Sequence, residues 1–129
     1  MKLTLADVMT KSPVSIEHHA SLQDAIQLMY SKGVNHLPVT KDGVLLGIIS
    51  DRDTKLAKAV TPAAKAVSMT VGELCNQDPF TVSSTEPLSN VAKVMVERKI
   101  GSALVTSQGM LVGIFTVTDA LRALITLQN

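Results

Sequence analysis

The chain has 129 residues, of which 46% are hydrophobic and 18% charged, with 12 basic and 11 acidic side chains. This length suits one domain with a real core, and a net charge of +1 argues against a basic nucleic-acid-binding surface. One Tyr and two Phe are too few for a base-stacking platform, and a single cysteine, Cys75, cannot form an internal disulfide. The N-terminus does not resemble a signal peptide, and no apolar run approaches the roughly 20 residues of a membrane helix, so we expect a soluble, cytoplasmic protein with no membrane partner.

An internal repeat organises the sequence. Shifted by 66 residues, the chain aligns with itself without a gap, so that Pro13 falls on Pro79 while the turn glycines and the apolar pattern keep one register. Chance does not preserve a register in this way. We predict two copies of one unit, residues 1–60 and 71–129, joined by a linker at 61–70.

The first half of each copy is predicted to be a strand followed by a helix. Residues 14–16 form a short apolar run after a proline, and residues 80–82 repeat it. From Leu22 and from Leu88, apolar residues then recur at i, i+3, i+4 and i+7, which is the spacing of an amphipathic helix. Ser21 marks the start of the first helix, and the dipeptide Glu-Pro precedes the second.

The second half of each copy is predicted to be a β-hairpin followed by a closing helix. Apolar strands at 37–40 and 44–49 flank Lys-Asp-Gly, and Asp-Gly between apolar runs is a strong hairpin signal. The second copy has the weaker but equivalent turn Ser-Gln-Gly. The closing helices are expected to begin at Ser50 and Thr116.

Each copy is expected to need a second layer of structure. A three-stranded sheet requires a cover on its open face, and the other repeat can provide it. We therefore predict a mixed α/β (α+β) fold in which the copies form a pseudo-two-fold pair. The alanine-rich linker shows no helical stripe, although residues 63–66 could add one helical turn.

The last helix carries more apolar residues than one buried stripe needs, which favours a homodimer. These residues are Ala120, Leu121, Ala123, Leu124, Ile125 and Leu127.

One local motif ends each hairpin. It reads Gly-Ile-Ile-Ser-Asp-Arg-Asp at 47–53 and Gly-Ile-Phe-Thr-Val-Thr-Asp at 113–119. Ser or Thr followed three residues later by an acid is a capping box, which needs no ligand. A helix start also attracts anions through its unpaired N–H groups, and an aspartate there can accept two hydrogen bonds from a vicinal diol such as a ribose. Because the motif occurs twice in register, it also indicates two related pockets, and both interpretations stay open.

Together these features resemble a CBS-domain pair, also called a Bateman module. The resemblance rests on the tandem units with their Pro-x-[Ser/Thr]-apolar openings, on Val-Asn-His-Leu-Pro-Val at 34–39 and on the motif at 47–53, and it covers nearly the whole chain. Among stand-alone members, the chain is most similar to short bacterial proteins of the acetoin-utilisation type. The resemblance implies regulatory binding of an adenosine compound (AMP, ADP, ATP or S-adenosylmethionine) in the cleft between the repeats, with no cofactor required.

The resemblance also implies which residues form the site. Asp53 and Asp119 would hold ribose hydroxyls, with Ser50 and Thr116 beside them. The opening strands and the second strands would frame the adenine through aliphatic side chains and backbone groups. These framing residues are Ser15, Ile16, Thr81 and Val82 on the opening strands, and His36, Leu37, Pro38, Ser102, Ala103 and Leu104 on the second strands.

Phosphate contacts would come from the few basic residues that could face the cleft. His36 stands where related modules often have a basic residue, and Arg52, Arg98 and Lys99 are further candidates. A serine replaces His36 and a threonine replaces Arg52 in the second repeat, so one competent site beside a weak one is as well supported as two sites. In related modules phosphates often reach the other repeat, in which case His36 would serve the pocket of Asp119. The alternative for His36 is a half-buried histidine bonded to a backbone carbonyl.

Other chemistry-bearing residues are given structural interpretations. His18 and His19 lie in a polar loop without further metal ligands at a usual spacing, so no metal site is predicted. Five methionines are expected to fill the core: Met9, Met29, Met69, Met95 and Met110. Cys75 is expected to pack as a small apolar residue. The sequence has no nucleophile elbow, phosphate-loop lysine or redox cysteine pair, so it is not expected to be an enzyme.

Two functions follow from this reasoning. The leading one is a regulatory module that binds an adenosine nucleotide, rearranges a dimer and passes its output to an effector protein that the sequence does not name. The alternative is a ligand-free scaffold or interaction module with the same fold. Its support is the divergence of the second repeat, where Val117 and Thr118 replace Asp51 and Arg52. Nucleic-acid binding would need a basic patch that the sequence lacks.

Overall fold

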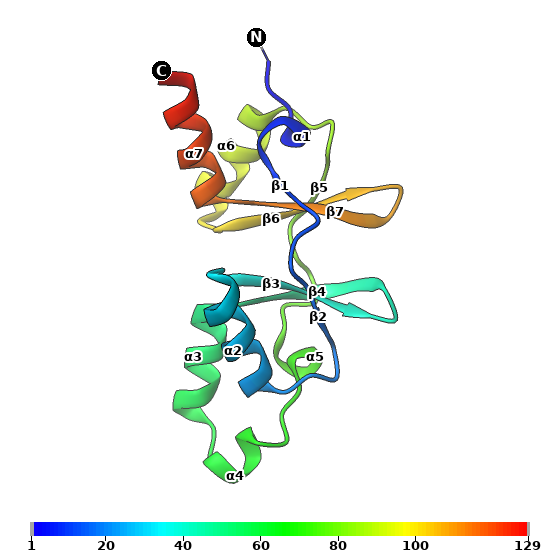
Figure 1. Ribbon diagram of the computed structural model, residues 1–129, viewed down its shortest axis with the longest axis vertical. Coiled ribbons are helices and arrows are strands. Elements are labelled where there is room, and N and C mark those ends of the chain that lie inside the picture. Colours follow the sequence, from blue (N-terminus) through cyan, green and yellow to red (C-terminus); the bar gives the residue numbers. More distant parts are fainter. Residues whose placement is uncertain (1, 129) are drawn as a thin grey trace. The chain divides into compact units, whose positions relative to one another are not determined.

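Two compact units make up the chain in the computed structural model, which describes residues 2–128 (Figure 1). The inner unit is Val14–Pro79, and the outer unit joins the residues up to Pro13 to those from Phe80 onward. Each unit has a small sheet, covering helices and its own hydrophobic core, so the fold is mixed α/β as predicted. The opening segment of the first repeat, up to Pro13, therefore belongs to the unit built mainly by the second repeat. The opening segment of the second repeat, residues 71–79, belongs to the unit built mainly by the first.

The inner unit contains a three-stranded sheet in the order β2-β3-β4. Strand β2 is parallel to β3, and β3 forms an antiparallel hairpin with β4. Ala25 and Met29 of one helix pack on Leu37 and Ile49 of the sheet in the core. The elements are β2 (Ile16–Glu17), α2 (Leu22–Lys32), β3 (His36–Lys41), β4 (Val44–Ser50), α3 (Asp51–Val60), α4 (Ala63–Ala66) and α5 (Val71–Leu74).

The outer unit contains a four-stranded sheet in the order β1-β7-β6-β5. Figure 1 shows α6 and α7 on the same face of this sheet, where Val91 and Met95 pack against Val105 and Phe115 in the core. Its elements are α1 (Leu5–Val8), β1 (Thr10–Lys11), β5 (Thr81–Ser83), α6 (Leu88–Arg98), β6 (Ser102–Ser107), β7 (Met110–Thr116) and α7 (Val117–Gln128).

Local capping fixes the ends of the first long helix in each unit. Ser21 caps α2, because its Oγ accepts a hydrogen bond from Asp24 N at 3.0 Å and its own N–H donates to Asp24 Oδ2 at 3.1 Å. Gly33 ends α2 in the left-handed conformation, with φ of 64°. Lys99 ends α6 in the same conformation, with φ of 56°, although its side chain makes this less favourable than glycine.

The two hairpins have the same two-residue turn. Asp42 and Gly43 have φ values of 52° and 82°, and Gln108 and Gly109 have 52° and 78°. Two successive left-handed residues characterise the type I′ turn, which matches the twist of antiparallel strands. The Ser-Gln-Gly turn is thus equivalent to Lys-Asp-Gly, as predicted.

The sequence does not predict the short helices α1 and α5, which occupy equivalent positions in the two repeats. Each opening segment packs on the sheet of a unit formed by the other repeat: β1 pairs with β7, and Asn76 pairs with Ile48 on β4. These close approaches require glycine. A Cβ on Gly47 would collide with the Asn76 carbonyl oxygen, and a Cβ on Gly113 would lie 2.5 Å from the Met9 sulfur.

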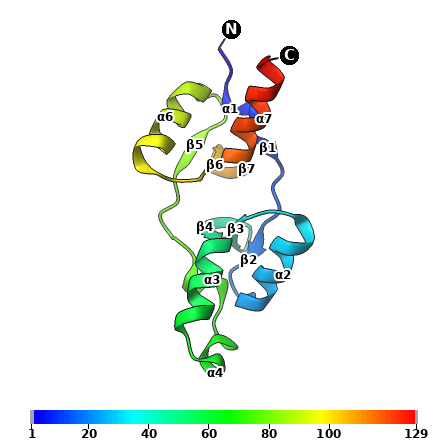
Figure 2. The same ribbon diagram turned by 90° about the vertical axis from the view of Figure 1, so that its left-hand side faces the viewer.

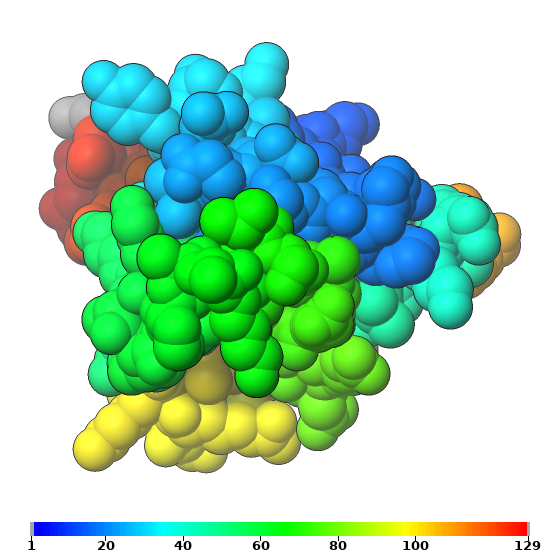
Figure 3. Space-filling model, turned by 90° about the horizontal axis from the view of Figure 1, so that it is seen from below, coloured from blue at the N-terminus to red at the C-terminus, as the bar shows by residue number. Residues whose placement is uncertain are grey.

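The linker contributes to the inner unit. The helical turn that the sequence allows at 63–66 is present as α4. Ser21 and Thr70 form an isolated β-bridge, and Figure 3 shows the connector (green) beside the start of α2 (blue). The connector is therefore attached to the inner unit through the start of α2.

Small differences separate the predicted and observed elements. The strands expected at 14–16 and 80–82 begin at Ile16 and Thr81, although the Phe80 carbonyl already accepts a hydrogen bond from Leu104 N on β6 at 2.8 Å. The prediction that Met110 fills the core is wrong: its side chain is 61% exposed at the end of the hairpin, where the strand extends past the covering helices.

Candidate functional site

In the inner unit, the motif at 47–53 joins β4 to α3. Ser50 is the N-cap of α3: its Oγ accepts a hydrogen bond from Asp53 N at 3.1 Å, and Ser50 N donates to Asp53 Oδ2 at 2.9 Å. The capping box is therefore present. Asp53 is nevertheless exposed, and within residues 2–128 its Oδ1 has no hydrogen-bond partner. This oxygen is available to accept hydrogen bonds from a ligand.

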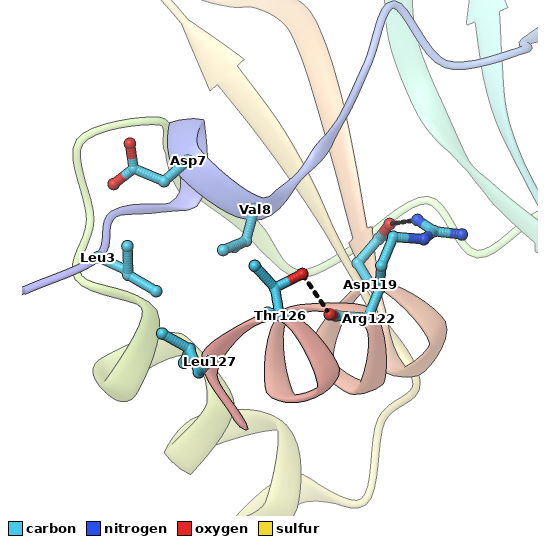
Figure 4. Close-up of a pocket in the computed structure, with 8 residues that line it drawn as sticks. Leu3, Asp7, Val8, Asp119, Arg122, Thr126 and Leu127 are labelled. Carbon is cyan, nitrogen blue, oxygen red and sulfur yellow. Dashed lines mark hydrogen bonds and ion pairs between the residues drawn. The ribbon is translucent and has the colours of Figure 1, made fainter. Parts of the chain in front are cut away.

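The outer unit has the same capping box in a different environment. Thr116 N donates to Asp119 Oδ2 at 2.9 Å, and Asp119 N donates to Thr116 Oγ1 at 3.4 Å. Asp119 Oδ1 accepts hydrogen bonds from Thr10 Oγ1 at 2.7 Å and from Arg122 Nη1 at 3.1 Å, the second of which Figure 4 shows. The Asp119 side chain is only 3% exposed, and both of its oxygens are engaged.

His36 begins β3 directly opposite Ser50 on β4. Opposite residues of an antiparallel pair share one face of the sheet, so His36 lies beside the start of α3. The imidazole is half-buried; this burial lowers the pKa of His36, and the negative charge of Asp53 acts in the opposite direction. In the second repeat, Ser102 faces Thr116 in the same register. Only the first repeat therefore has a titratable side chain at this position.

The other candidates on the strands divide between the two faces of each sheet. Leu37, Ala103 and Ile16 are buried in the two cores, so they leave only backbone groups for a ligand. Pro38 follows Leu37 and lies on the opposite face with His36, because side chains alternate along a strand. Ser15 and Thr81 are exposed, Val82 is half-buried against the outer core, and Leu104 is fully buried.

Two further polar side chains that the sequence singles out are Arg52 and Cys75. Arg52 is exposed in the first turn of α3. Cys75 packs in the inner core, where burial raises the pKa of its thiol. Across residues 2–128, no group of three or more His, Cys, Asp or Glu side chains is placed to hold a metal ion.

A cavity of about 230 Å³ lies in the outer unit between α1 and α7 (Figure 4). It is smaller than the roughly 300–1,000 Å³ of ordinary small-molecule sites. Its walls are mainly apolar, and Asp119 and Arg122 border it. The lining residues are Leu3, Asp7, Val8, Asp119, Arg122, Ala123, Thr126 and Leu127.

Comparison with known proteins identifies the family. Residues 5–57 and 71–126 match the family model of the CBS domain. The chain belongs to the CBS-domain family. A CBS domain-containing protein from Dictyostelium discoideum is 30% identical over 135 residues, which cover 97% of this CBS chain and 93% of that protein. The chain spans only 22% of another relative, L-aspartate semialdehyde sulfurtransferase from Methanocaldococcus jannaschii, at 30% identity over 118 residues (90% of this chain).

Solved structures share the fold of this CBS protein. A putative acetoin utilization protein (AcuB) from Vibrio cholerae has a TM-score of 0.90 and 29% identity, covering 99% of this chain and 94% of that one. The CBS domain pair of protein MJ0100, in complex with 5′-methylthioadenosine and S-adenosyl-L-methionine, has a TM-score of 0.87 and 26% identity over 98% of both chains. CBSX2 in complex with AMP has a TM-score of 0.83 and 29% identity over 98% of both chains. The predicted family and the likeness to acetoin-utilisation proteins are confirmed.

Sequence reasoning about this CBS chain does not identify Thr10 and Arg122 as partners of Asp119. A signal for them exists in the repeat, because their counterparts 66 residues away are Asn76 and Leu56. Arg122 carries hydrogen-bond donors where Leu56 has none, and Thr10 is replaced by Asn76. These differences between the copies indicate that the two aspartates have different surroundings. In the part of the chain that the structure describes, no helix is both long and apolar enough to cross a membrane.

Proposed function

We propose that this CBS protein is a regulatory module that binds an adenosine-containing small molecule, whose ribose hydroxyls are accepted by Asp53. The observation that carries the proposal is the exposed Asp53 Oδ1 at the start of α3, beside His36. Similar CBS proteins have been solved with AMP and with S-adenosyl-L-methionine and 5′-methylthioadenosine, all of which contain adenosine.

The residues around Asp53 supply the remaining contacts. The two ribose O–H groups donate to the Asp53 carboxylate, while Ser50 keeps its capping bonds to the side chain and the backbone N–H of Asp53. Arg52 supplies the positive charge for a phosphate, the neutral imidazole of His36 supplies a ring N–H donor, and Pro38 offers apolar surface on the face that His36 shares. Backbone groups of Ser15, Ile16 and Leu37 frame the adenine. The candidates of the second repeat form a weaker set, because a serine replaces the imidazole: Thr81, Val82, Ser102, Ala103 and Thr116.

The proposed mechanism is differential binding rather than chemistry. The repeats, residues 1–60 and 71–129, act as one module of a cytoplasmic homodimer, and the ligand favours one arrangement of that dimer. A ligand shifts such an equilibrium only by its difference in affinity between the two states. The module needs no cofactor and passes its signal to an effector protein.

A thermal-shift panel tests the binding step. AMP, ADP, ATP and S-adenosylmethionine are compared with GMP, which has the same ribose and phosphate on another base. A ligand present at about 100 times its Kd adds roughly 2.7 kcal/mol to the free energy of unfolding and raises the midpoint by several degrees. We expect a saturable shift with at least one adenosine compound and a smaller one with GMP. Flat traces with all four adenosine compounds would contradict the proposal.

A ligand-free scaffold is the second candidate function. It is favoured by the capping boxes themselves, which account for Ser50 and Asp53, and for Thr116 and Asp119, without a ligand. On this alternative, replacing Asp53 by alanine costs only the value of a cap, about 1 kcal/mol, and changes no binding.

A further inference from the structure

We infer that the two aspartates of the motif have different tasks: Asp53 alone receives the hydroxyl pair of the ligand, whereas Thr10 and Arg122 hold Asp119 as a structural group of the outer unit. This inference rests on the proposed function and adds that the second aspartate of the motif has a structural task in place of a ribose contact. It separates two residues that occupy the same position in a repeated motif.

The hydrogen-bonding capacity of Asp119 is already used. A carboxylate has about four acceptor sites. Oδ1 accepts from Thr10 and Arg122, at 2.7 and 3.1 Å, and Oδ2 accepts from the backbone and hydroxyl of Thr116, at 2.9 and 3.1 Å. With 3% of its side chain exposed, Asp119 could accept a diol only by losing two of these donors.

Asp53 has the same capping bond and nothing more. Its Oδ2 accepts from Ser50 N at 2.9 Å, and its Oδ1 is left for a ligand among the described residues. Because the side chain is exposed, two hydroxyl groups can approach it without displacing a protein donor. A ligand would therefore have to displace protein hydrogen-bond donors at Asp119 but not at Asp53.

The repeat explains why the two sites differ. Arg122 stands three residues after Asp119, one helical turn on, and Leu56 stands three residues after Asp53. Leu56 has no donor. The counterpart of Thr10 is Asn76, whose side chain instead accepts a hydrogen bond from Asp78 N at 3.0 Å. Both donors that engage Asp119 are thus absent from the site of Asp53.

Isothermal titration with AMP and with 2′-deoxy-AMP tests the assignment, because the deoxy compound has lost one hydroxyl of the pair. We expect the wild-type protein to prefer AMP about tenfold to a hundredfold, as for a hydrogen bond to a charged group. Asp53→Ala is expected to remove this preference. Asp119→Ala is expected to keep it while lowering the midpoint of thermal unfolding by more than Asp53→Ala does, because the Asp119 side chain loses the hydrogen bonds from Thr10, Arg122 and the Thr116 hydroxyl in addition to the capping bond.

Three outcomes have distinct meanings. Loss of the preference in Asp119→Ala, with Asp53→Ala unchanged, would overturn the inference and leave the proposed function standing. Binding of neither compound by the wild-type protein would overturn both. If Asp119→Ala does not fold, Asp119→Asn is the replacement, since it keeps the shape and the cap; loss of the preference in that folded variant would overturn the inference.

A second variant places an arginine three residues after Asp53, as Arg122 stands three residues after Asp119. Leu56 is 62% exposed and the Arg122 side chain is 68% exposed, so Leu56→Arg places the same side chain at the same spacing on the surface. Adenosine is the probe, because an added cation would attract a phosphate. We expect Leu56→Arg to weaken adenosine binding about two- to fivefold, the range of an exposed ion pair, and Leu56→Met to leave it unchanged. Equal affinities in the two variants would show that an arginine at this position does not occupy the aspartate.

Discussion

At the scale of single residues, His36 links the folding of the inner unit to pH. Burial lowers the pKa of His36 below its usual 6.5, so the unfolded chain binds more protons than the folded one just below that pH. The stability that comes from burying a neutral His36 is therefore complete above about pH 6.5 and is lost as the pH falls through the lowered pKa of the folded state.

We predict that His36→Gln loses less unfolding free energy than the wild-type protein between about pH 7.5 and pH 5.5, as measured by urea denaturation. This range lies above the pKa of Glu17, which the Thr40 hydroxyl lowers from its usual 4.5, so that carboxylate stays ionised. His19→Gln is the matched control, since His19 is exposed, and it is expected to follow the wild-type curve. Parallel curves for His36→Gln and the wild-type protein would refute the prediction.

At the scale of elements, the opening segments are held to the sheets by backbone contacts at two glycines. Ile48 and Asn76 exchange two hydrogen bonds, of 3.0 and 2.9 Å, and the Asn76 carbonyl leaves no room for a side chain on Gly47. At Gly113 the nearest obstacle is the flexible Met9 side chain, with the Thr10 carbonyl oxygen at 3.0 Å behind it. The two glycines are therefore equivalent in the repeat but differ in what they face.

We predict that Gly47→Ala lowers the unfolding free energy by about 2 kcal/mol or more, because backbone must shift, and Gly113→Ala by about 1 kcal/mol, because a methionine can rotate away. Chemical denaturation of both variants measures the difference. Gly113→Ala with Met9→Ala provides the control, and it should recover part of the loss. If Gly113→Ala is the more damaging of the two, the docking of these segments has been misassigned.

The same contacts explain which elements the sequence predicts. Helix α2, the hairpins and the closing helices follow from local signals: Ser21 at a helix start, glycine in a turn, and the capping box at Ser50. The four-residue helices α1 and α5 have too short a pattern to recognise and depend on sheets distant in sequence. For the same reason the state of Asp119 is hidden, since Thr10 lies 109 residues away in the chain.

At the scale of the whole molecule, the closing helices α3 and α7 differ on the sides that face away from their sheets. On the sides that face the sheets, Thr54 and Ala57 of α3 are buried, and Ala120 and Ala123 at the same positions of α7 are half-buried. The outer side of α3 carries charges, including an ion pair between Lys55 and Asp51 at 2.9 Å. The corresponding positions of α7 are apolar and more than half exposed: Val117, Leu121 and Leu124. If the proposed dimer forms, this difference favours α7 over α3 as its contact surface.

We predict that Leu121→Lys with Leu124→Lys, which introduces the lysines found on α3, weakens the dimer at least about a hundredfold, because two buried leucines each contribute about 1.5–3 kcal/mol. Light scattering coupled to size exclusion measures the mass as the protein is diluted. The control is Val96→Lys on α6, which changes an apolar residue that is even more exposed than Leu121 and Leu124 and is expected to leave the dimer intact. A wild-type monomer would refute the dimer itself. A dimer that survives the α7 variant but is lost in Val96→Lys would move the contact to α6.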